Sequence, residues 1–260
     1  MRPDTVESTF SDLVVQGTHR RFVVCRMGQT GSAWLSKLLN SHPDVYCEHE
    51  SIISKIYPKA HPVREDQINF VKWMAHDTKH YAYQAVGDIG SLDMDLALEL
   101  PREHFTVGLL LRHPALQIQT RLNTLRESPP DPDNDDNLRQ MEAYINEVFG
   151  INPSQYDLAD RLFLIVSWLW YCQIQNAREV NCVLRIEDMA QVKSAQESLL
   201  QLTGLEYDSQ IIKNVMKSSD DHLIVTAEST KDAFNQFSDR QRQWYKKMIH
   251  DFAEKIGYTL

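Results

Sequence analysis

The chain has 260 residues, of which 42% are hydrophobic and 24% charged, a composition typical of a folded globular protein that excludes wholesale disorder. The formal net charge is −9, so the chain lacks the basic footprint of a nucleic-acid-binding protein, and we expect no nucleic-acid partner. The longest apolar run, Leu162–Cys172, is broken only by Ser167 and is too short to cross a bilayer. The polar first twenty residues lack the apolar core of a signal peptide. We therefore expect a cytoplasmic protein without a membrane partner.

The cysteines give a further indication of the cellular compartment. The sequence contains four of them, and they form neither a C-x-x-C pair nor a His/Cys cluster with zinc spacing. We therefore predict reduced thiols, as is usual in the cytosol, and no metal site.

The first fifty residues predict a strand, a loop, a helix and a second strand. Residues 20–27 (RRFVVCRM) form a short apolar run typical of a buried strand, and glycines then mark a turn at 28–31. Apolar residues recur at helical spacing over 32–40, and Pro43 ends that helix. A second strand is predicted over 45–47.

The rest of the chain alternates in the same way. Residues 51–83 have weak helical patterning, and the Pro- and Asp-rich segment 127–137 predicts an exposed loop. Strands are predicted over 85–89, 105–111 and 181–186, and helices over 92–100, 114–125, 158–178, 190–203, 208–218 and 238–256. This alternation predicts an α/β fold: a single domain, residues 1–260, with a central, mostly parallel sheet flanked by helices on both faces.

The segment 26–34 (RMGQTGSAW) joins the first strand to the first helix, which is where a phosphate-binding loop belongs. Backbone N–H groups and the helix N-terminus converge there on an anion, and glycine lets the backbone approach closely. Ser32 could cap the helix and donate its hydroxyl to a phosphate. An ordinary βα turn would also need glycine. The Gly-Lys-Ser/Thr triplet of nucleotide hydrolases is replaced by Gly31-Ser32-Ala33, which disfavours a P-loop kinase or NTPase.

Three motifs in order carry a family resemblance. The first is Gln29–Leu35 followed by Leu38–Asp44 (LLNSHPD). The second is a buried strand ending in Arg112, with the hydroxyl residue Thr120 eight positions later. The third is the Ile-Glu-Asp-Met run at 186–189. In these motifs the sequence resembles the sulfotransferases that use 3'-phosphoadenosine-5'-phosphosulfate (PAPS) as sulfate donor.

The resemblance implies a P-loop-like strand–loop–helix at the N-terminus and an enzyme that moves a sulfuryl group from PAPS to a hydroxyl or amine of a small-molecule acceptor, as in natural-product tailoring. The product is 3',5'-bisphosphoadenosine (PAP), and the chemistry needs no metal. The oligomeric state stays open, with a homo-oligomer among the alternatives. The implied donor-binding residues are Arg26, Gln29, Thr30, Gly31, Ser32, Ala33, Trp34, Arg112, Thr120 and Lys231. Arg112 also ends a strand where ligands of open α/β sheets bind, although a strand-end arginine can equally pair with a carboxylate.

The main departure from the family pattern is Gln29, which stands where the family places a lysine or arginine that touches the transferring sulfate. Because the leaving phosphate gains negative charge, a cation there stabilises the transition state. Arg26, Lys37 or Lys231 could replace it, or each could be a solvated surface cation. A PAP- or PAPS-binding protein with weak or lost catalysis is therefore an alternative. Ala33 also removes a hydroxyl that is usual in the loop.

Sulfation needs a general base beside the acceptor. Four residues near the carboxyl ends of the second and third predicted strands are candidates, in the order Glu50, His49, Glu48 and Asp88. Each of them could instead be a solvated loop residue. Residues 127–160 are expected to form a lid or insertion over the acceptor, whose aspartates could attract a cationic acceptor or simply be solvated.

Overall fold

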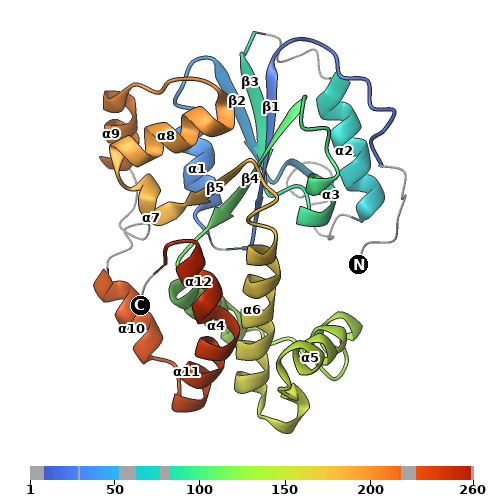
Figure 1. Cartoon of the computed structure of the whole chain (residues 1–260), viewed down its shortest axis with the longest axis vertical. Helices are drawn as coiled ribbons and strands as arrows, with labels where there is room; N and C mark the ends of the chain where they lie inside the picture. The colour runs from blue at the N-terminus through green and yellow to red at the C-terminus, as the bar shows by residue number, and fades with distance from the viewer. Residues whose placement is uncertain (1–8, 29, 53–62, 77–81, 218–226, 259–260) are drawn as a thin grey trace. The chain divides into compact units, whose positions relative to one another are not determined.

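A computed structural model describes residues 9–28, 30–52, 63–76, 82–217 and 227–258 (Figure 1). Its contacts divide the chain into two compact units. We call residues 1–26, 31–111 and 177–223 the sheet unit, and residues 27–30, 112–176 and 224–260 the helical unit. The expectation that residues 1–260 form one domain, with 127–160 as an acceptor lid, stays a prediction.

The sheet unit is built on five parallel strands in the order β2-β3-β1-β4-β5. The predicted α/β fold class with a parallel sheet is thereby confirmed. The strands are β1 (Arg20–Arg26), β2 (Val45–His49), β3 (Ala85–Ile89), β4 (Phe105–Leu111) and β5 (Cys182–Arg185). Every residue of β3 and β4 is buried, as expected for inner strands of a parallel sheet with both faces covered.

Helices cover both faces of this sheet, as the sequence predicted (Figure 1). They are α1 (Ser32–Leu39), α2 (Arg64–His76), α3 (Met94–Leu98), α7 (Ile186–Met189), α8 (Val192–Thr203) and α9 (Ser209–Lys217). Val23 and Cys25 of β1 and Val107 of β4 point into one core cluster together with the apolar residues of α2 and α3. α8 packs on β1 and β4, and Figure 1 shows it on the opposite side from α2.

The packing of the sheet on one face depends on Gly87 in β3. Phe22, its register neighbour on β1, is fully buried, and a Cβ at position 87 would lie 2.2 Å from its ring. We expect G87A to lower the free energy of unfolding by about 3 kcal/mol, because a buried ring has nowhere to move. G108A is the matched control: its Cβ would lie 3.2 Å from the flexible end of Leu202, so a loss of about 1 kcal/mol or less is expected. Urea unfolding of the two variants measures these losses in the free energy of unfolding. Equal losses would contradict the special role of Gly87.

The helical unit contains the remaining described helices. They are α4 (Pro114–Glu127), α5 (Asp136–Phe149), the short 3₁₀ helix η2 (Pro153–Gln155), α6 (Leu158–Gln175), α10 (Ala227–Asn235), α11 (Asp239–Tyr245), the π-helical turn η4 (Lys246–His250) and α12 (Asp251–Lys255). α6 packs against α4, α5 and α11. The predicted helix over 238–256 is thus observed as three consecutive helical segments.

The acidic segment that was predicted as a loop leads directly into α5, which the sequence analysis did not identify. Its carboxylates serve local structure: Asp135 caps α5 by accepting the N–H groups of Asn137 and Leu138, and Asp133 pairs with Arg161. Asp136 pairs with Arg139. These local partners favour a structural role for the aspartates over attraction of a cationic acceptor.

All four cysteines are free thiols. Cys25, Cys47 and Cys182 are buried on β1, β2 and β5 respectively, and burial raises the pKa of each of these thiols well above its ordinary value. Within the residues that the structure describes, no helix combines the length and apolar character needed to cross a membrane.

Candidate functional site

The carboxyl end of β1 lies at the point where the connections between the strands change direction. β1 lies at the centre, and the chain leaves it toward the edge strand β2, whereas the connections after β3 and β4 run the other way. Ligands of open parallel sheets bind at such a switch point, outside the carboxyl ends of the strands. In the register of the sheet, Val24 of β1 and His49 of β2 both align with Ile89 of β3, so the residues that follow them meet at one edge.

The first helix begins beside this edge at a glycine. Gly31 occupies the N-cap position of α1 with φ 81°, a left-handed conformation that glycine adopts without steric cost. The expectation that Ser32 caps the helix is wrong, because Ser32 is already the first helical residue and the cap carries no side-chain hydrogen bond. Its hydroxyl instead lies 2.9 Å from Nε2 of His49.

His49 is a half-buried imidazole at this edge. Burial, and then the positive charge of Arg26, lower its pKa from the ordinary value of 6.5. The neutral form therefore prevails at neutral pH. A neutral histidine carries a proton on one ring nitrogen and a lone pair on the other, so its hydrogen bond to Ser32 determines which nitrogen is free to accept a proton.

Arg26 is the last residue of β1, and its guanidinium forms an ion pair with Glu50, which directly follows β2. Both side chains are largely buried, with 13% and 26% of their surface exposed. Gly90 leaves room for this arginine, since a Cβ at that position would lie 2.7 Å from Nε of Arg26. The cation is therefore held at the centre of the sheet edge rather than extended into solvent.

Asp88, the fourth candidate base, is buried and fully engaged. It accepts hydrogen bonds from the backbone N–H of Ser51 at 3.2 Å, the backbone N–H of Ser91 at 3.0 Å and the hydroxyl of Ser51 at 2.5 Å. Burial raises the pKa of Asp88. The Ser51 hydroxyl also contacts Glu48, whose other oxygen accepts from the Tyr46 hydroxyl at 2.7 Å. Asp88 thus holds the turn after β2 in place.

Ser51 and Ser91 were not identified from the sequence. The spacing of Asp88 and Ser91 is that of an aspartate which accepts the N–H three residues later, a common turn motif, and this signal could have found Ser91. No comparable local signal links Ser51 to Asp88, because Ser51 follows β2 whereas Asp88 lies near the end of β3.

In the helical unit, Gly28 and Thr30 of the loop after β1 each take part in a hydrogen bond. Thr30 is fully buried and donates its hydroxyl to the Met27 carbonyl at 3.1 Å. Gln117 of α4, also fully buried, donates from Nε2 to the Gly28 carbonyl at 3.3 Å. Its Oε1 has no hydrogen-bond partner among the described residues, and the sequence analysis missed this glutamine.

The start of α4 carries the second family motif. Arg112 is half-buried and directly precedes His113, which caps α4 by accepting the Ala115 N–H and packs edge-on against Tyr258. His113 is therefore structural. Thr120 donates its hydroxyl to the Leu116 carbonyl of its own helix at 2.7 Å, which leaves its oxygen lone pairs for other donors.

The predicted site residues therefore fall into distinct groups. Six of them meet at the carboxyl edge of the sheet unit: Arg26, Ser32, Glu48, His49, Glu50 and Asp88. On α1, Ala33 and Lys37 are exposed and Trp34 is half-buried, and Lys231 is exposed on α10. Gln29 lies outside the described residues. That Arg112 and the glycine turn grip one ligand stays a prediction.

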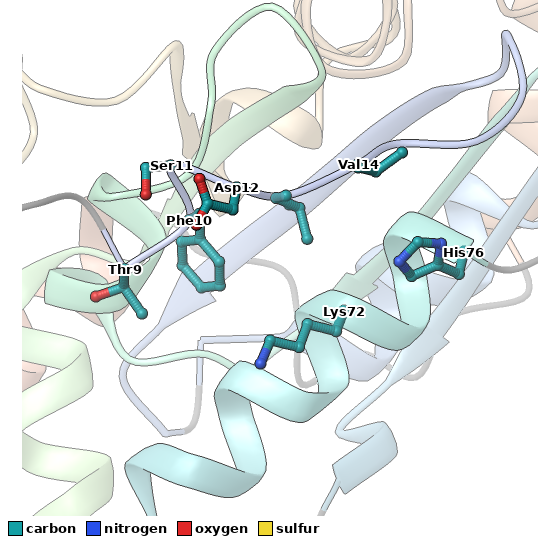
Figure 2. A pocket seen from close by; sticks show the side chains of 8 residues that line it. Thr9, Phe10, Ser11, Asp12, Val14, Lys72 and His76 are labelled. Carbon is teal, nitrogen blue, oxygen red and sulfur yellow. The ribbon is translucent and has the colours of Figure 1, made fainter.

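A separate cavity of about 390 Å³ lies in the sheet unit between the N-terminal segment and α2 (Figure 2). It is lined by Thr9, Phe10, Ser11, Asp12, Leu13, Val14, Lys72 and His76. None of the predicted site residues lines it. Among the described residues, no group of three or more His, Cys, Asp and Glu side chains is arranged to hold a metal ion.

Comparisons with known proteins find similar solved structures but no matching family. No protein-family model matches the chain, and no curated protein matches it. A mouse sulfotransferase, SULT7A1, solved as a complex with PAP, aligns over 97% of this chain and 92% of its own, with 14% identity and a TM-score of 0.49. The sulfotransferase domain of a Synechococcus olefin synthase aligns over 94% of this chain and 97% of its own, with 15% identity and a TM-score of 0.46.

Two sulfotransferases are thus among the solved structures to which this chain is similar, with both TM-scores below 0.5. Both solved structures belong to the group of enzymes that the sequence motifs resemble. A likeness with such low identity and TM-scores below 0.5 says nothing about donor or acceptor. The function argued below therefore rests on the residues of this chain.

Proposed function

We propose that the chain transfers a sulfuryl group from PAPS to a hydroxyl or amine of a small-molecule acceptor. The observation that carries the proposal is that three features lie together at the carboxyl end of β1. They are the neutral imidazole of His49, the guanidinium of Arg26 in its ion pair, and the N-terminus of α1, which begins after Gly31. The sequence motifs that resemble the sulfotransferases supply the identity of the donor. A cytoplasmic location, the absence of a nucleic-acid partner and assembly into a homo-oligomer remain predictions.

The residues at this edge fit an anionic donor. The first turn of α1 offers backbone N–H groups, Gly31 adds no Cβ that would block a phosphate, and Arg26 supplies a positive charge. Arg26 is the best candidate to replace the cation that the family has at position 29, because it is held inside the edge while Lys37 and Lys231 are exposed. Arg112 and Thr120 are proposed to bind the second phosphate of the donor, for which the Thr120 hydroxyl must turn its proton from the Leu116 carbonyl to a phosphate oxygen.

His49 is the residue that we assign as general base. If Nε2–H of His49 donates to the Ser32 oxygen, the lone pair is on Nδ1, and the Ser32 hydroxyl can donate onward to a donor phosphate. The acceptor oxygen or nitrogen then attacks sulfur while the bond from sulfur to the 5'-phosphate oxygen breaks. Nδ1 takes the acceptor's proton, and PAP leaves with the electron pair of the broken bond.

The other three base candidates receive different roles. Glu50 is paired with Arg26, Glu48 contacts Tyr46 and Ser51, and the carboxylate of Asp88 already accepts three hydrogen bonds. We assign Asp88 as a positioning residue, because it fixes the turn that carries His49 and Glu50.

Binding of PAP without turnover is the second candidate function, favoured by the glutamine at position 29. A P-loop kinase or NTPase is disfavoured by the missing lysine in Gly31-Ser32-Ala33. Release of labelled sulfate from PAPS to an acceptor mixture separates transfer from binding alone. ATP turnover with Mg²⁺ would favour the kinase.

A thermal-shift screen tests the donor directly. A ligand at 100 times its Kd stabilises the folded state by about 2.7 kcal/mol, which raises the Tm of a chain of this size by roughly 5–10 °C. We expect PAP to give a shift of this size and ATP at the same concentration to give much less. A larger shift with ATP than with PAP would refute the proposed donor.

A further inference from the structure

Glu50 has an unusual backbone. Its φ is 52°, and it is the only non-glycine residue with positive φ in the part of the chain that the structure describes. This left-handed region is disfavoured for a residue with a Cβ, and such residues persist only where their surroundings hold them. Here the N–H of Glu50 donates to the Ile89 carbonyl at the end of β3, at 2.8 Å. The end of β3 thus holds Glu50 in a disfavoured conformation.

This conformation places the carboxylate of Glu50 on Arg26. Arg26 in turn lies against Gly90, in a space that a larger residue at position 90 would fill. Both members of the ion pair are therefore built into the sheet edge, in contrast to flexible surface pairs, which contribute little. The main candidate cation of the site is occupied by a carboxylate of the same chain.

A guanidinium binds carboxylate, sulfate and phosphate oxygens through the same planar set of N–H donors. An anion that binds Arg26 through this set must therefore take the place of the Glu50 carboxylate. The two anions also repel each other, so simultaneous occupation of the same face of the guanidinium is unfavourable.

We propose that Glu50 is an internal competitor for Arg26, which the anionic sulfate–phosphate end of the donor must displace. This inference rests on the proposed function, because it assigns Arg26 to the donor. The pair lowers the affinity for weakly charged anions and keeps the arginine in place until the donor arrives. If the pair is formed about nine-tenths of the time, it raises the apparent Kd of the donor about tenfold.

The test compares the binding of PAP to the wild type and to E50Q by isothermal titration calorimetry at fixed pH and ionic strength. Glutamine keeps the shape of Glu50 and removes its charge, so E50Q is expected to bind PAP about tenfold more tightly. E99Q is the matched control, because it removes a carboxylate from the exposed Arg64–Glu99 pair of the same unit. E99Q is expected to bind PAP as the wild type does.

Equal or weaker binding of PAP by E50Q would overturn the inference, and weaker binding would mean that Glu50 orients Arg26 for the donor. If neither protein binds PAP, the proposed function fails, and inorganic sulfate then tests the competition alone. E50Q should be stabilised in thermal unfolding at lower sulfate concentrations than the wild type. Identical sulfate dependence of the two proteins would refute the competition as well.

Discussion

R26Q is expected to lower kcat/KM for sulfuryl transfer by roughly a thousandfold, the loss typical of removing one preorganised donor to a developing anion. The sequence from Met27 to Gly31 contains no lysine or arginine, so Arg26 is the nearest cation to the expected phosphate position along the chain. It ends the central strand and is held by its surroundings at the sheet edge. Charge on the leaving phosphate would then meet a neutral amide instead of a guanidinium. Steady-state kinetics with PAPS and an identified acceptor measure the loss.

R185Q provides the matched control for this prediction. Arg185 ends β5, an edge strand of the same sheet, and pairs with Asp188 at 2.5 Å. Its replacement is expected to leave kcat/KM within about twofold, because this pair joins residues only three positions apart and lies on β5, at the opposite edge of the strand order from His49 on β2. If R26Q keeps its activity, Arg26 is not the missing cation, and Lys37 and Lys231 become the candidates. Partial recovery in the double variant R26Q/Q29K would show that charge near the phosphate is what the reaction needs.

H49Q is expected to lower kcat by about 10²- to 10⁴-fold, the usual contribution of a general base. The amide nitrogen of glutamine can still donate to the Ser32 hydroxyl, but the side chain offers no basic lone pair. Binding of PAP should therefore stay close to the wild-type value. A rate unchanged by H49Q would exclude His49 as the base, and a loss confined to PAP affinity would assign it a binding role.

The pH dependence gives a second test of His49. A base must be unprotonated to work, so activity falls as the pH falls through its pKa. Burial and Arg26 lower this pKa below 6.5, and we therefore expect the acid limb of kcat/KM below pH 6.5. The neighbouring charged groups at the edge are Arg26, Glu48, Glu50 and Asp88, and H49Q should remove the limb if none of the carboxylates is the base. An acid limb retained in H49Q would point to Glu50 or Glu48.

The elements that position the site could be predicted from the sequence because their signals are local. The apolar run before the glycines predicted β1, and the helical spacing after them predicted α1. Candidate bases were found because parallel strands bring their carboxyl ends to one edge, so polar residues after β2 and at the end of β3 had to be neighbours of Arg26. α5 was missed because its acidic start resembles a solvated loop, although Asp135 is in fact its cap.

The pairing of side chains could not be predicted, because it depends on register and on positions far apart in the chain. Nothing local to Ser32 indicates that its hydroxyl meets His49 seventeen residues later. The same holds for Ser51 with Asp88, and for Gln117 with the Gly28 carbonyl. The left-handed backbone of Glu50 was also unforeseen, since glutamate has no preference for that region.

The buried cysteines allow local opening of the sheet to be measured strand by strand. Cys25, Cys47 and Cys182 lie on three different strands, and only a thiolate exposed to solvent reacts quickly with an alkylating reagent. Burial disfavours the thiolate in the native state. Each cysteine can therefore be alkylated only when the strand that carries it opens. Mass spectrometry of the labelled peptides can therefore rank the opening equilibria of the central strand β1 and the edge strands β2 and β5 without an engineered probe.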